Sequence, residues 1–237
     1  MLALLLPPSE GKAPGGGRPR WRPGSGRFRR LGPARAEVAE ALAAAGGGDQ
    51  RLLGAKGELL ERSRMANRSL IDGPTLPAWQ RFTGVVWEHV APGDLDPEST
   101  ARAEDSVFVI SAVTGLSAWS DPVPDFRLKL SVPLPGLGRL DRFWREPVSN
   151  TLDDHVRGRT VVDLLPNEHR AAWDPDPDRY DLVRPVLSTP DGKPAGHGGK
   201  AAKGLLARAL LESDHVERTL ATFDASPLVL TIDRPTP

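Results

Sequence analysis

The chain has 237 residues, 31 basic and 31 acidic side chains, and no cysteine. This length can bury a core without disulfides or metals, and the lack of cysteine excludes a disulfide scaffold, a thiolate nucleophile and Cys-ligated zinc or iron–sulfur sites. The apolar run at residues 2–6 is too short for a signal peptide, and no later run approaches membrane-spanning length. We therefore expect a cytoplasmic protein without a membrane partner.

The basic residues are spread unevenly, although the net charge is zero. Residues 13–33 are rich in Gly, Arg and Pro and lack apolar periodicity, which predicts a mobile basic loop that is available to an anionic partner. Against a single acid, Glu10, residues 1–35 hold eight basic side chains: Lys12, Arg18, Arg20, Arg22, Arg27, Arg29, Arg30 and Arg35.

Strand and helix patterns interleave along the first half of the chain. Val, Ile and Phe are concentrated at residues 107–113, which form the clearest buried strand. Residues 85–90 fit either a strand or a helix. The other predicted elements, in chain order, are a strand at 2–6, helices at 34–45 and 50–70, a short helix capped by Thr75, a helix at 96–103, and a strand with alternating polarity at 126–132.

The same interleaving continues to the end of the chain, and no solenoid-like repeat interrupts it. The pattern predicts a mixed α/β (α+β) fold in which residues 1–237 form a single globular unit around one shared core. The predicted elements are a helix at 139–156 with a kink or break at Pro147, a strand at 161–165, a short helix at 167–173, a strand at 182–187, a turn at 190–193, a helix at 200–213, a further helix, and a strand at 227–233.

Several common catalytic motifs are incomplete. Gly11-Lys12 and Gly199-Lys200 both lack the first glycine of a P-loop. The aspartates at 174–178 begin like a calcium-binding EF-hand loop, but Arg179 stands where that loop requires glycine. The chain also contains neither a nucleophile elbow nor an HExxH motif. We predict neither a metal site nor a cofactor.

Two turns that carry glycine and lysine are the strongest candidates for binding. Residues 7–12, which include Ser9 and Lys12, follow the first strand, and residues 196–204 lead into a helix. The first N–H groups of a helix attract anions, and Lys200 and Lys203 lie on neighbouring positions of one helical face. We expect the two turns to meet and to place Lys12, Lys200 and Lys203 in one concave anion site. The alternative is a tight glycine loop with solvated lysines.

Three residues are candidates for acid–base chemistry if the protein is an enzyme. His197 is the best placed of the five histidines for acid–base chemistry, because it lies within the second glycine turn. Asn167 and Glu168 follow a predicted strand, where polar side chains often line a cleft. The alternatives are a loop histidine that is satisfied by backbone groups, and an Asn–Glu pair that caps a short helix.

Three further basic residues are candidates for contact with nucleic acid. Arg145 follows Phe143 and Trp144, so the segment could present an aromatic face and a guanidinium to a base or sugar. The alternative is that the two aromatic residues belong to the core. Arg127 and Lys129 alternate on one face of the strand predicted at 126–132, and the alternative for them is a solvated sheet face.

Six motifs in sequence order together resemble the YaaA family of peroxide stress response proteins, over nearly the whole chain. No single motif is specific, but their order and spacing are similar to those of the family. They are residues 7–12 (PPSEGK), 82–87 (FTGVVW), 111–116 (SAVTGL) with Pro122 and 126–128 (FRL), 143–145 (FWR) with Asn150, 163–168 (DLLPNE) and 200–204 (KAAKG).

The resemblance implies a YaaA-type fold with a basic cleft, DNA binding through a helix–hairpin–helix-like element, and a role in limiting oxidative damage linked to iron. Residues 52–57 (LLGAKG) are the counterpart of that element by this resemblance, with an ordinary helical hairpin as the alternative. The sequence departs from the better-known members at Ser9–Gly11 and at residues 196–199, both in the expected cleft.

We therefore expect a protein of the peroxide stress response that binds double-stranded DNA through phosphate contacts. The alternative is an enzyme that acts on a small phosphorylated or nucleobase-containing substrate in the same cleft, with His197, Glu168 and Asn167 as its catalytic residues. A third hypothesis is an interaction protein whose Gly/Arg loop contacts RNA or a partner. The anion-binding residues predicted for the first two are Ser9, Lys12, Arg127, Lys129, Arg145, Lys200 and Lys203.

Overall fold

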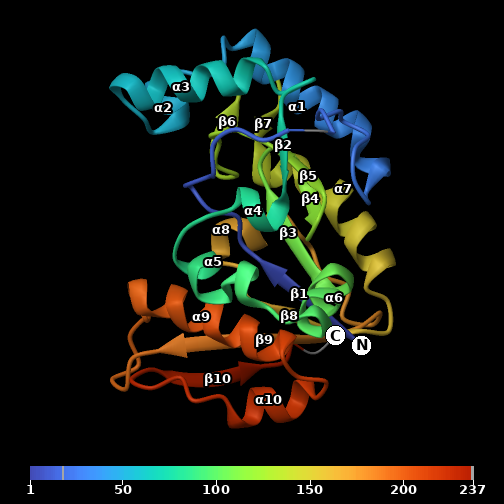
Figure 1. Ribbon diagram of the computed structural model, residues 1–237, viewed down its shortest axis with the longest axis vertical. Coiled ribbons are helices and arrows are strands. Elements are labelled where there is room, and N and C mark those ends of the chain that lie inside the picture. Colours follow the sequence, from blue (N-terminus) through green and yellow to red (C-terminus); the bar gives the residue numbers. More distant parts are fainter. Residues whose placement is uncertain (18, 236–237) are drawn as a thin grey trace.

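A six-stranded mixed sheet runs through the computed structural model, which describes residues 1–17 and 19–235 (Figure 1). The helices and the sheet form one globular unit, which confirms the predicted mixed α/β fold. In their order across the sheet, the strands are β10 (Val229–Asp233), β9 (Asp181–Ser188), β8 (Thr160–Asp163), β1 (Leu2–Leu6), β3 (Val107–Ser111) and β4 (Gly115–Ala118).

The first strand of the chain occupies the middle of this sheet. All five residues of β1 are buried, and β1 is parallel to β3 on one side and to β8 on the other. β8 is in turn parallel to β9. Strands that are covered on both faces are apolar throughout, which explains the unbroken apolar run at the start of the chain. The carboxyl ends of β9, β8, β1 and β3 consequently share one edge of the sheet.

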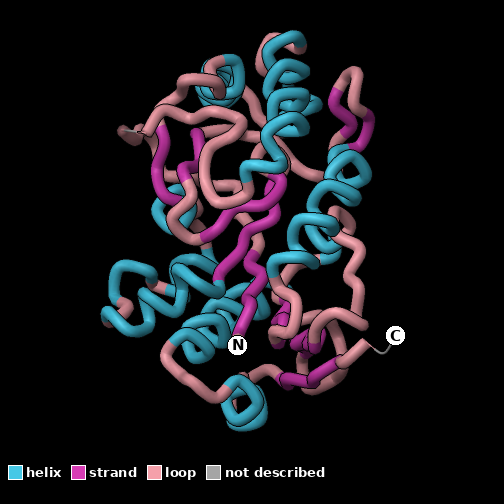
Figure 2. The backbone as a smooth tube through the Cα atoms, turned by 90° about the vertical axis from the view of Figure 1, so that its right-hand side faces the viewer, coloured by secondary structure: helices cyan, strands magenta, loops and turns pink. Residues whose placement is uncertain are grey.

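Helices lie on both sides of the strands (Figure 2). The α1–α3 region lies at one end of the molecule, and β9, β10 and α10 lie at the other (Figure 1). No helix in the described part of the chain is long and apolar enough to cross a membrane. The helices are α1 (Gly32–Ala44), α2 (Gln50–Leu53), α3 (Gly57–Arg68), α4 (Ala78–Arg81), α5 (Val85–Val90), α6 (Pro97–Ser106), α7 (Leu140–His155), α8 (Asn167–Arg170), α9 (Gly196–Leu211) and α10 (Val216–Thr222).

Short elements complete the fold. β2 (Thr75–Pro77) pairs with β5 (Pro122–Pro124), and β6 (Pro133–Leu134) pairs with β7 (Gly138–Arg139). Single 3₁₀ turns occupy Arg29–Leu31 and Pro92–Asp94. The segment at 85–90, which fitted either element, is helical, and α7 continues through Pro147.

The strand predicted at residues 126–132 is wrong. Phe126, Leu128 and Leu130 are buried, so the alternating polarity is real, but the segment pairs with no strand in the described part of the chain. Its backbone groups bond elsewhere: the N–H of Arg127 donates to Asn67 Oδ1 at 3.0 Å, and the carbonyl of Leu130 accepts from the Asp141 N–H at 2.9 Å. An extended segment that packs one side against the core therefore shows the same alternation of buried and exposed residues as a strand.

Thr75 does not cap a helix, contrary to the prediction. It lies in β2 opposite Pro124, and its hydroxyl donates to the carbonyl of Pro19. The short helix α4 begins only at Ala78, with Pro77 at its N-cap position. The hydroxyl that appeared free to cap a helix is thus used to attach the basic N-terminal segment.

Much of the segment predicted as a mobile basic loop is packed against the protein. Trp21 and Phe28 are buried. Arg22 forms an ion pair with Asp72 at 2.8 Å, and Arg30 forms one with Asp154 at 2.9 Å. Arg18 lies outside the described residues. Several of the eight N-terminal basic side chains are therefore already partnered within the chain.

Gly204 allows α9 to pack closely against α5. A Cβ at this position would lie 2.4 Å from the Val86 carbonyl oxygen and 2.6 Å from the His89 Cβ. We expect Gly204→Ala to lower the free energy of unfolding by about 1–3 kcal/mol, because neither element can move without disturbing the core. Urea unfolding measures the change. Gly198→Ala on the same helix is the matched control, since a Cβ there meets nothing closer than 3.8 Å. Equal losses in both variants would contradict the prediction.

Candidate functional site

A cavity of about 870 Å³ lies where the parallel strands end. Its walls include the segments that directly follow β1 and β8, which is where ligands bind in α/β sheets. The volume is typical of pockets for small ligands. The lining residues are 7–12, 83–87, Ala112, Phe126, 128–130, 164–170, 185–187, 194–196, Gly199, Lys200 and Lys203.

The cavity brings together both glycine turns that the sequence singled out. The placement of Lys12, Lys200 and Lys203 around one concave space agrees with the expectation, and their role in binding stays a prediction. The chain has six lysines, Lys12, Lys56, Lys129, Lys193, Lys200 and Lys203. Four of them line this cavity, so lysine is concentrated here. Ser9, Asn167 and Glu168 line it as well.

The turn that follows β1 is fixed against α5 by hydrogen bonds. Ser9 Oγ accepts from the N–H of Thr83 at 2.8 Å and donates to the carbonyl of Gly11. Trp87 Nε1 donates to the carbonyl of Pro7 at 3.0 Å. Ser9 therefore holds the shape of the turn, and its hydroxyl is already engaged on both sides.

The ammonium group of Lys12 is enclosed, although other parts of the residue remain accessible. Its Nζ lies 4.2 Å from the centroid of the Phe126 ring and donates to the carbonyl of Ser9 at 2.9 Å. Burial lowers the pKa of Lys12 to about 7. Nearby charges oppose one another, because Asp125 and Glu10 raise this pKa while Arg127 and Arg81 lower it.

The segment that follows β8 is held by a buried carboxylate. Asp163 is fully buried, and its Oδ2 accepts from Arg170 Nε at 2.7 Å and from Arg184 Nε at 3.3 Å. Its Oδ1 accepts from the N–H of Leu165 at 2.9 Å. This arrangement fixes residues 164–170, which form one wall of the cavity.

His169 is the histidine that lines the cavity. Its Nδ1 is buried and has no hydrogen-bond partner among the described residues. Burial lowers the pKa of His169 to about 4, so the ring is neutral at pH 7. Glu168 lies beside it and accepts a hydrogen bond from Ser131 Oγ at 2.9 Å. A neutral imidazole and a carboxylate are thus available on the same wall as polar groups for a ligand.

The two lysines of α9 have different environments. Lys200 is exposed near the start of the helix. Lys203 is half-buried, its Nζ donates to the carbonyl of Leu164 at 2.9 Å, and burial lowers its pKa. Lys203 is therefore not the solvated lysine that the alternative interpretation assumed, because it also ties α9 to the segment after β8.

Glu10 offsets part of the positive charge at this site. Its carboxylate lies 2.7 Å from Lys129 Nζ and 3.6 Å from Arg127 Nη2. The hydrogen bond from Lys129 and the neighbouring cations lower the pKa of Glu10. Arg127 also donates from Nε to the carbonyl of Leu53 at 3.0 Å and is not among the lining residues. The structure thus places Arg127 behind Glu10 rather than in the cavity.

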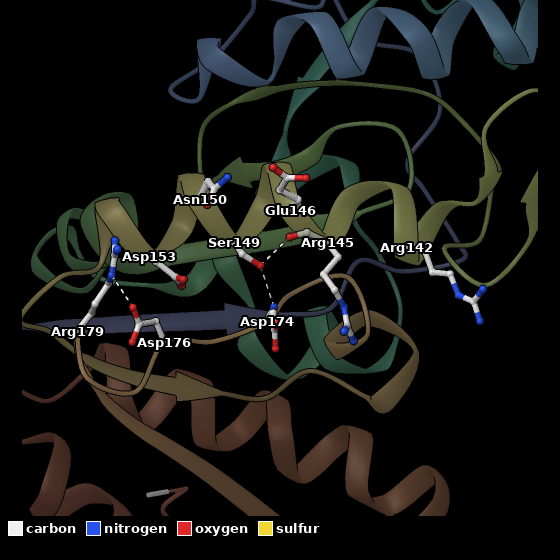
Figure 3. Close-up of a pocket in the computed structure, with 9 residues that line it drawn as sticks. All are labelled: Arg142, Arg145, Glu146, Ser149, Asn150, Asp153, Asp174, Asp176 and Arg179. Carbon is white, nitrogen blue, oxygen red and sulfur yellow. Dashed lines mark hydrogen bonds and ion pairs between the residues drawn. The ribbon is translucent and has the colours of Figure 1, made fainter. Parts of the chain in front are cut away.

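His197 and Arg145 lie outside the cavity. His197 is exposed on α9 and is not a lining residue. Arg145 projects from α7 into a separate polar pocket of about 440 Å³ (Figure 3), and its Nε donates to the carbonyl of Ala171 at 3.2 Å. Trp144 beside it is fully buried, as the core interpretation predicted. The structure therefore does not group these two residues with the lysines.

Comparison with known proteins shows which family the chain belongs to. A family model described as peroxide stress protein YaaA matches residues 2–227. The chain belongs to the YaaA family. Similar relatives include a UPF0246 protein of Streptomyces coelicolor, 34% identical over 89% of this chain and 83% of that protein. A UPF0246 protein of Corynebacterium efficiens is 30% identical over 90% of this chain and 86% of its own length.

The motifs that carry the YaaA resemblance have distinct tasks in this structure. Residues 7–12 and most of 163–168 form cavity wall, whereas Phe82 and Trp144 belong to the core. In the motif at 200–204, both lysines line the cavity, and Gly204 permits helix packing. His169 was not among the residues predicted for catalysis. Its position directly after the DLLPNE motif was the signal that could have identified it.

Proposed function

We propose that this protein, as a member of the YaaA family of peroxide stress proteins, binds nucleotide phosphates in the cavity, with DNA as their expected source. The observation that carries the proposal is the gathering of four of the six lysines around one nucleotide-sized space. Lys200 supplies an exposed charge near the first N–H groups of α9, which favour anions. Lys203 supplies a second charge deeper in the same wall.

The volume of the cavity limits how DNA can bind. A space of about 870 Å³ accommodates one nucleotide, whereas a duplex must stay outside it. Lys129 and Lys200 are the exposed lysines of the lining, and Lys129 is paired with Glu10. We therefore expect the duplex to contact this protein at few phosphates, with an unpaired nucleotide or strand end entering the cavity.

We expect the affinity for duplex DNA to fall with salt only gently and to be largely independent of sequence. Each phosphate contact contributes about 0.9 to the slope of log K against log salt concentration, so two or three contacts predict a slope of about −2 to −3. Fluorescence anisotropy with labelled duplexes measures this slope. A slope as steep as −7 would instead indicate that the N-terminal arginines bind the backbone.

A second candidate function is catalysis on a small phosphorylated or nucleobase-containing substrate. The unpartnered Nδ1 of His169 favours it, because of the three buried side-chain atoms without a partner among the described residues it is the one that belongs to a lining residue of the cavity. Glu168 and Lys12 line the same cavity, so a substrate there can contact an imidazole, a carboxylate and an amine. Of the residues predicted for catalysis, Glu168 and Asn167 line the cavity, and in this proposal His169 and Lys12 take the place of His197.

Substitution of Lys200 tests the proposal directly. We expect Lys200→Ala to weaken binding of mononucleotides and single-stranded DNA about tenfold, because a charge-assisted hydrogen bond to phosphate is lost. The melting temperature should stay near wild type, since Lys200 is exposed. Lys193→Ala is the control, because Lys193 is exposed, pairs with Asp191 and is not a lining residue.

Two results would separate the candidates. Unchanged binding for both Lys200→Ala and Lys203→Ala would reject phosphate binding at this site. Affinity that is the same for a mononucleotide and for DNA of any length would favour the enzyme over the DNA-binding protein. For Lys203→Ala, the melting temperature must be measured together with the affinity. This substitution also removes the hydrogen bond to the Leu164 carbonyl, so a loss of binding could come from a loss of stability.

A further inference from the structure

We propose that Lys12 is a nucleophilic amine that condenses with the aldehyde or ketone carbonyl of a phosphate ester held in the cavity. The choice of a phosphate ester rests on the proposed function. The nucleophilic role of Lys12 does not, because it follows from the surroundings of the amine itself.

The surroundings of Lys12 differ from those of the paired lysines. Lys129 and Lys193 each have a carboxylate within 2.7 Å of Nζ, whereas no carboxylate of the described residues lies within ion-pairing distance of Lys12 Nζ. The nearest acid in sequence, Glu10, is engaged by Lys129 and Arg127. The amine instead meets the face of Phe126 and one acceptor, the carbonyl of Ser9. A neutral amine can donate this bond and keep its lone pair free.

The protonation state of this amine suits nucleophilic attack. With a pKa of about 7, Lys12 has a substantial neutral fraction at pH 7. A lysine at its ordinary pKa is neutral in only about one molecule in 2,500. The charged groups that act on Lys12 are Asp125, Glu10, Arg127 and Arg81, and they oppose one another, so burial decides the outcome. A buried amine of this kind is the usual nucleophile in imine-forming enzymes.

The proposed step balances without any further reactant. The lone pair of the neutral amine forms a bond to the carbonyl carbon, and the carbonyl oxygen takes up a proton to give a carbinolamine. The two hydrogens of the amine leave with that oxygen as water, and an imine between Lys12 and the ligand remains. Glu168 and His169 line the same cavity and are the groups available to relay the protons. Lys200 and Lys203 would hold the phosphate.

The test uses pyridoxal 5′-phosphate, an aldehyde that carries a phosphate, with pyridoxal as the matched probe without it. The full-length protein is incubated with each probe, reduced with borohydride and digested, and mass spectrometry locates the label. Only six lysines and the α-amino group of Met1 compete, so the label is readily mapped. We expect the phosphorylated probe to label Lys12 at least tenfold faster than Lys56 or Lys193, and the rate to rise with pH to a plateau above about pH 7.

Variants separate the nucleophile from the phosphate site. Lys12→Arg keeps a donor for the Ser9 carbonyl but cannot form the imine, and Lys12→Met keeps the length of the side chain without charge. Both should abolish labelling at position 12, and unchanged tryptophan fluorescence would show that the fold is retained. Lys200→Ala should slow labelling by the phosphorylated probe about tenfold and leave labelling by pyridoxal unchanged. Lys193→Ala should alter neither.

The outcomes are distinguishable. Label spread over Lys56, Lys193 and Lys200 without preference for Lys12 would overturn the proposal, as would label at Lys203 alone. Equal labelling of Lys12 by both probes would support the nucleophile and reject the phosphate site.

A second arm identifies the source of the carbonyl. An oligonucleotide with one abasic deoxyribose carries an aldehyde between two phosphates. A borohydride-dependent adduct between this DNA and Lys12 would support DNA as the source of the phosphate ester. Labelling by the small probe, together with no DNA adduct, would support a free phosphate ester.

Discussion

Arg35→Met should lower the free energy of unfolding by at least about 3 kcal/mol. Arg35 is only 2% exposed, and its guanidinium donates at 2.7–3.1 Å to four backbone carbonyls, those of Pro23, Ser25, Thr114 and Leu116. When a buried arginine pairs with a carboxylate, both members of the pair can often be replaced together by apolar side chains without loss of stability. Such a double replacement is impossible here, because the partners of Arg35 are backbone carbonyls. Each buried carbonyl that loses its donor lowers the free energy of unfolding by about 1–3 kcal/mol.

Urea unfolding followed by tryptophan fluorescence measures the loss. Arg29→Met is the matched control, since Arg29 is exposed only six residues earlier in the chain, and its replacement should change stability by no more than about 0.5 kcal/mol. If the two variants unfolded at the same urea concentration, the four hydrogen bonds would contribute nothing that water cannot replace.

Asp163→Asn is expected to cost about 3 kcal/mol and also to disturb the cavity. The substitution keeps the shape of the side chain but removes the negative charge that faces Arg170 and Arg184. Asp163 is fully buried, and removal of one member of a buried ion pair is strongly destabilising. We place the value at the lower end of the usual range because both arginines keep some contact with water.

Two measurements check this second prediction. Urea unfolding should show the loss of stability, and labelling of Lys12 by pyridoxal 5′-phosphate should slow in the folded variant because residues 164–170 lose their anchor. Asp191→Asn serves as the comparison, since Asp191 is exposed and pairs only with groups of its own turn. A stable Asp163→Asn protein with normal labelling would show that the hydrogen bonds alone hold this segment.

The sequence was sufficient to predict most of the sheet. Residues 2–6 and 107–110 are unbroken apolar runs, and such runs occur where both faces of a strand are covered. The segment at 126–132 was misassigned because alternating burial also occurs in an extended segment without a neighbouring strand. The alternation of polar and apolar residues indicates which side chains are buried, but it does not indicate whether a neighbouring strand is present. Here the backbone N–H and carbonyl of Arg127 bond to the side chain of Asn67, a residue far away in the sequence.

The candidate site was predictable only where backbone topology decides it. Lys12 and Lys200 share a cavity because each lies in a segment that follows a strand of the same parallel set, β1, β8 and β9. The carboxyl ends of parallel strands lie at one edge of the sheet, so the segments that follow them meet there. Side-chain direction was not predictable in the same way. His197 was expected in a glycine turn and His169 in a short helix after a strand, yet of the two only His169 lines the cavity. Arg127 is held back by the carbonyl of Leu53, a contact that no local pattern indicates.

The central position of β1 also determines when the site can form during synthesis. β1 can pair with β3 first, but Leu5 also pairs with Asp163, so the strand gains its second neighbour only after more than 150 further residues have been made. At about 5–20 residues per second, this delay is on the order of 8–30 s. Lys200, Lys203 and the rest of α9 follow later still. Lys12 is therefore an ordinary, solvated and protonated lysine in the early nascent chain. We expect it to gain its neighbour Phe126 well before β8 and α9 complete the cavity around it.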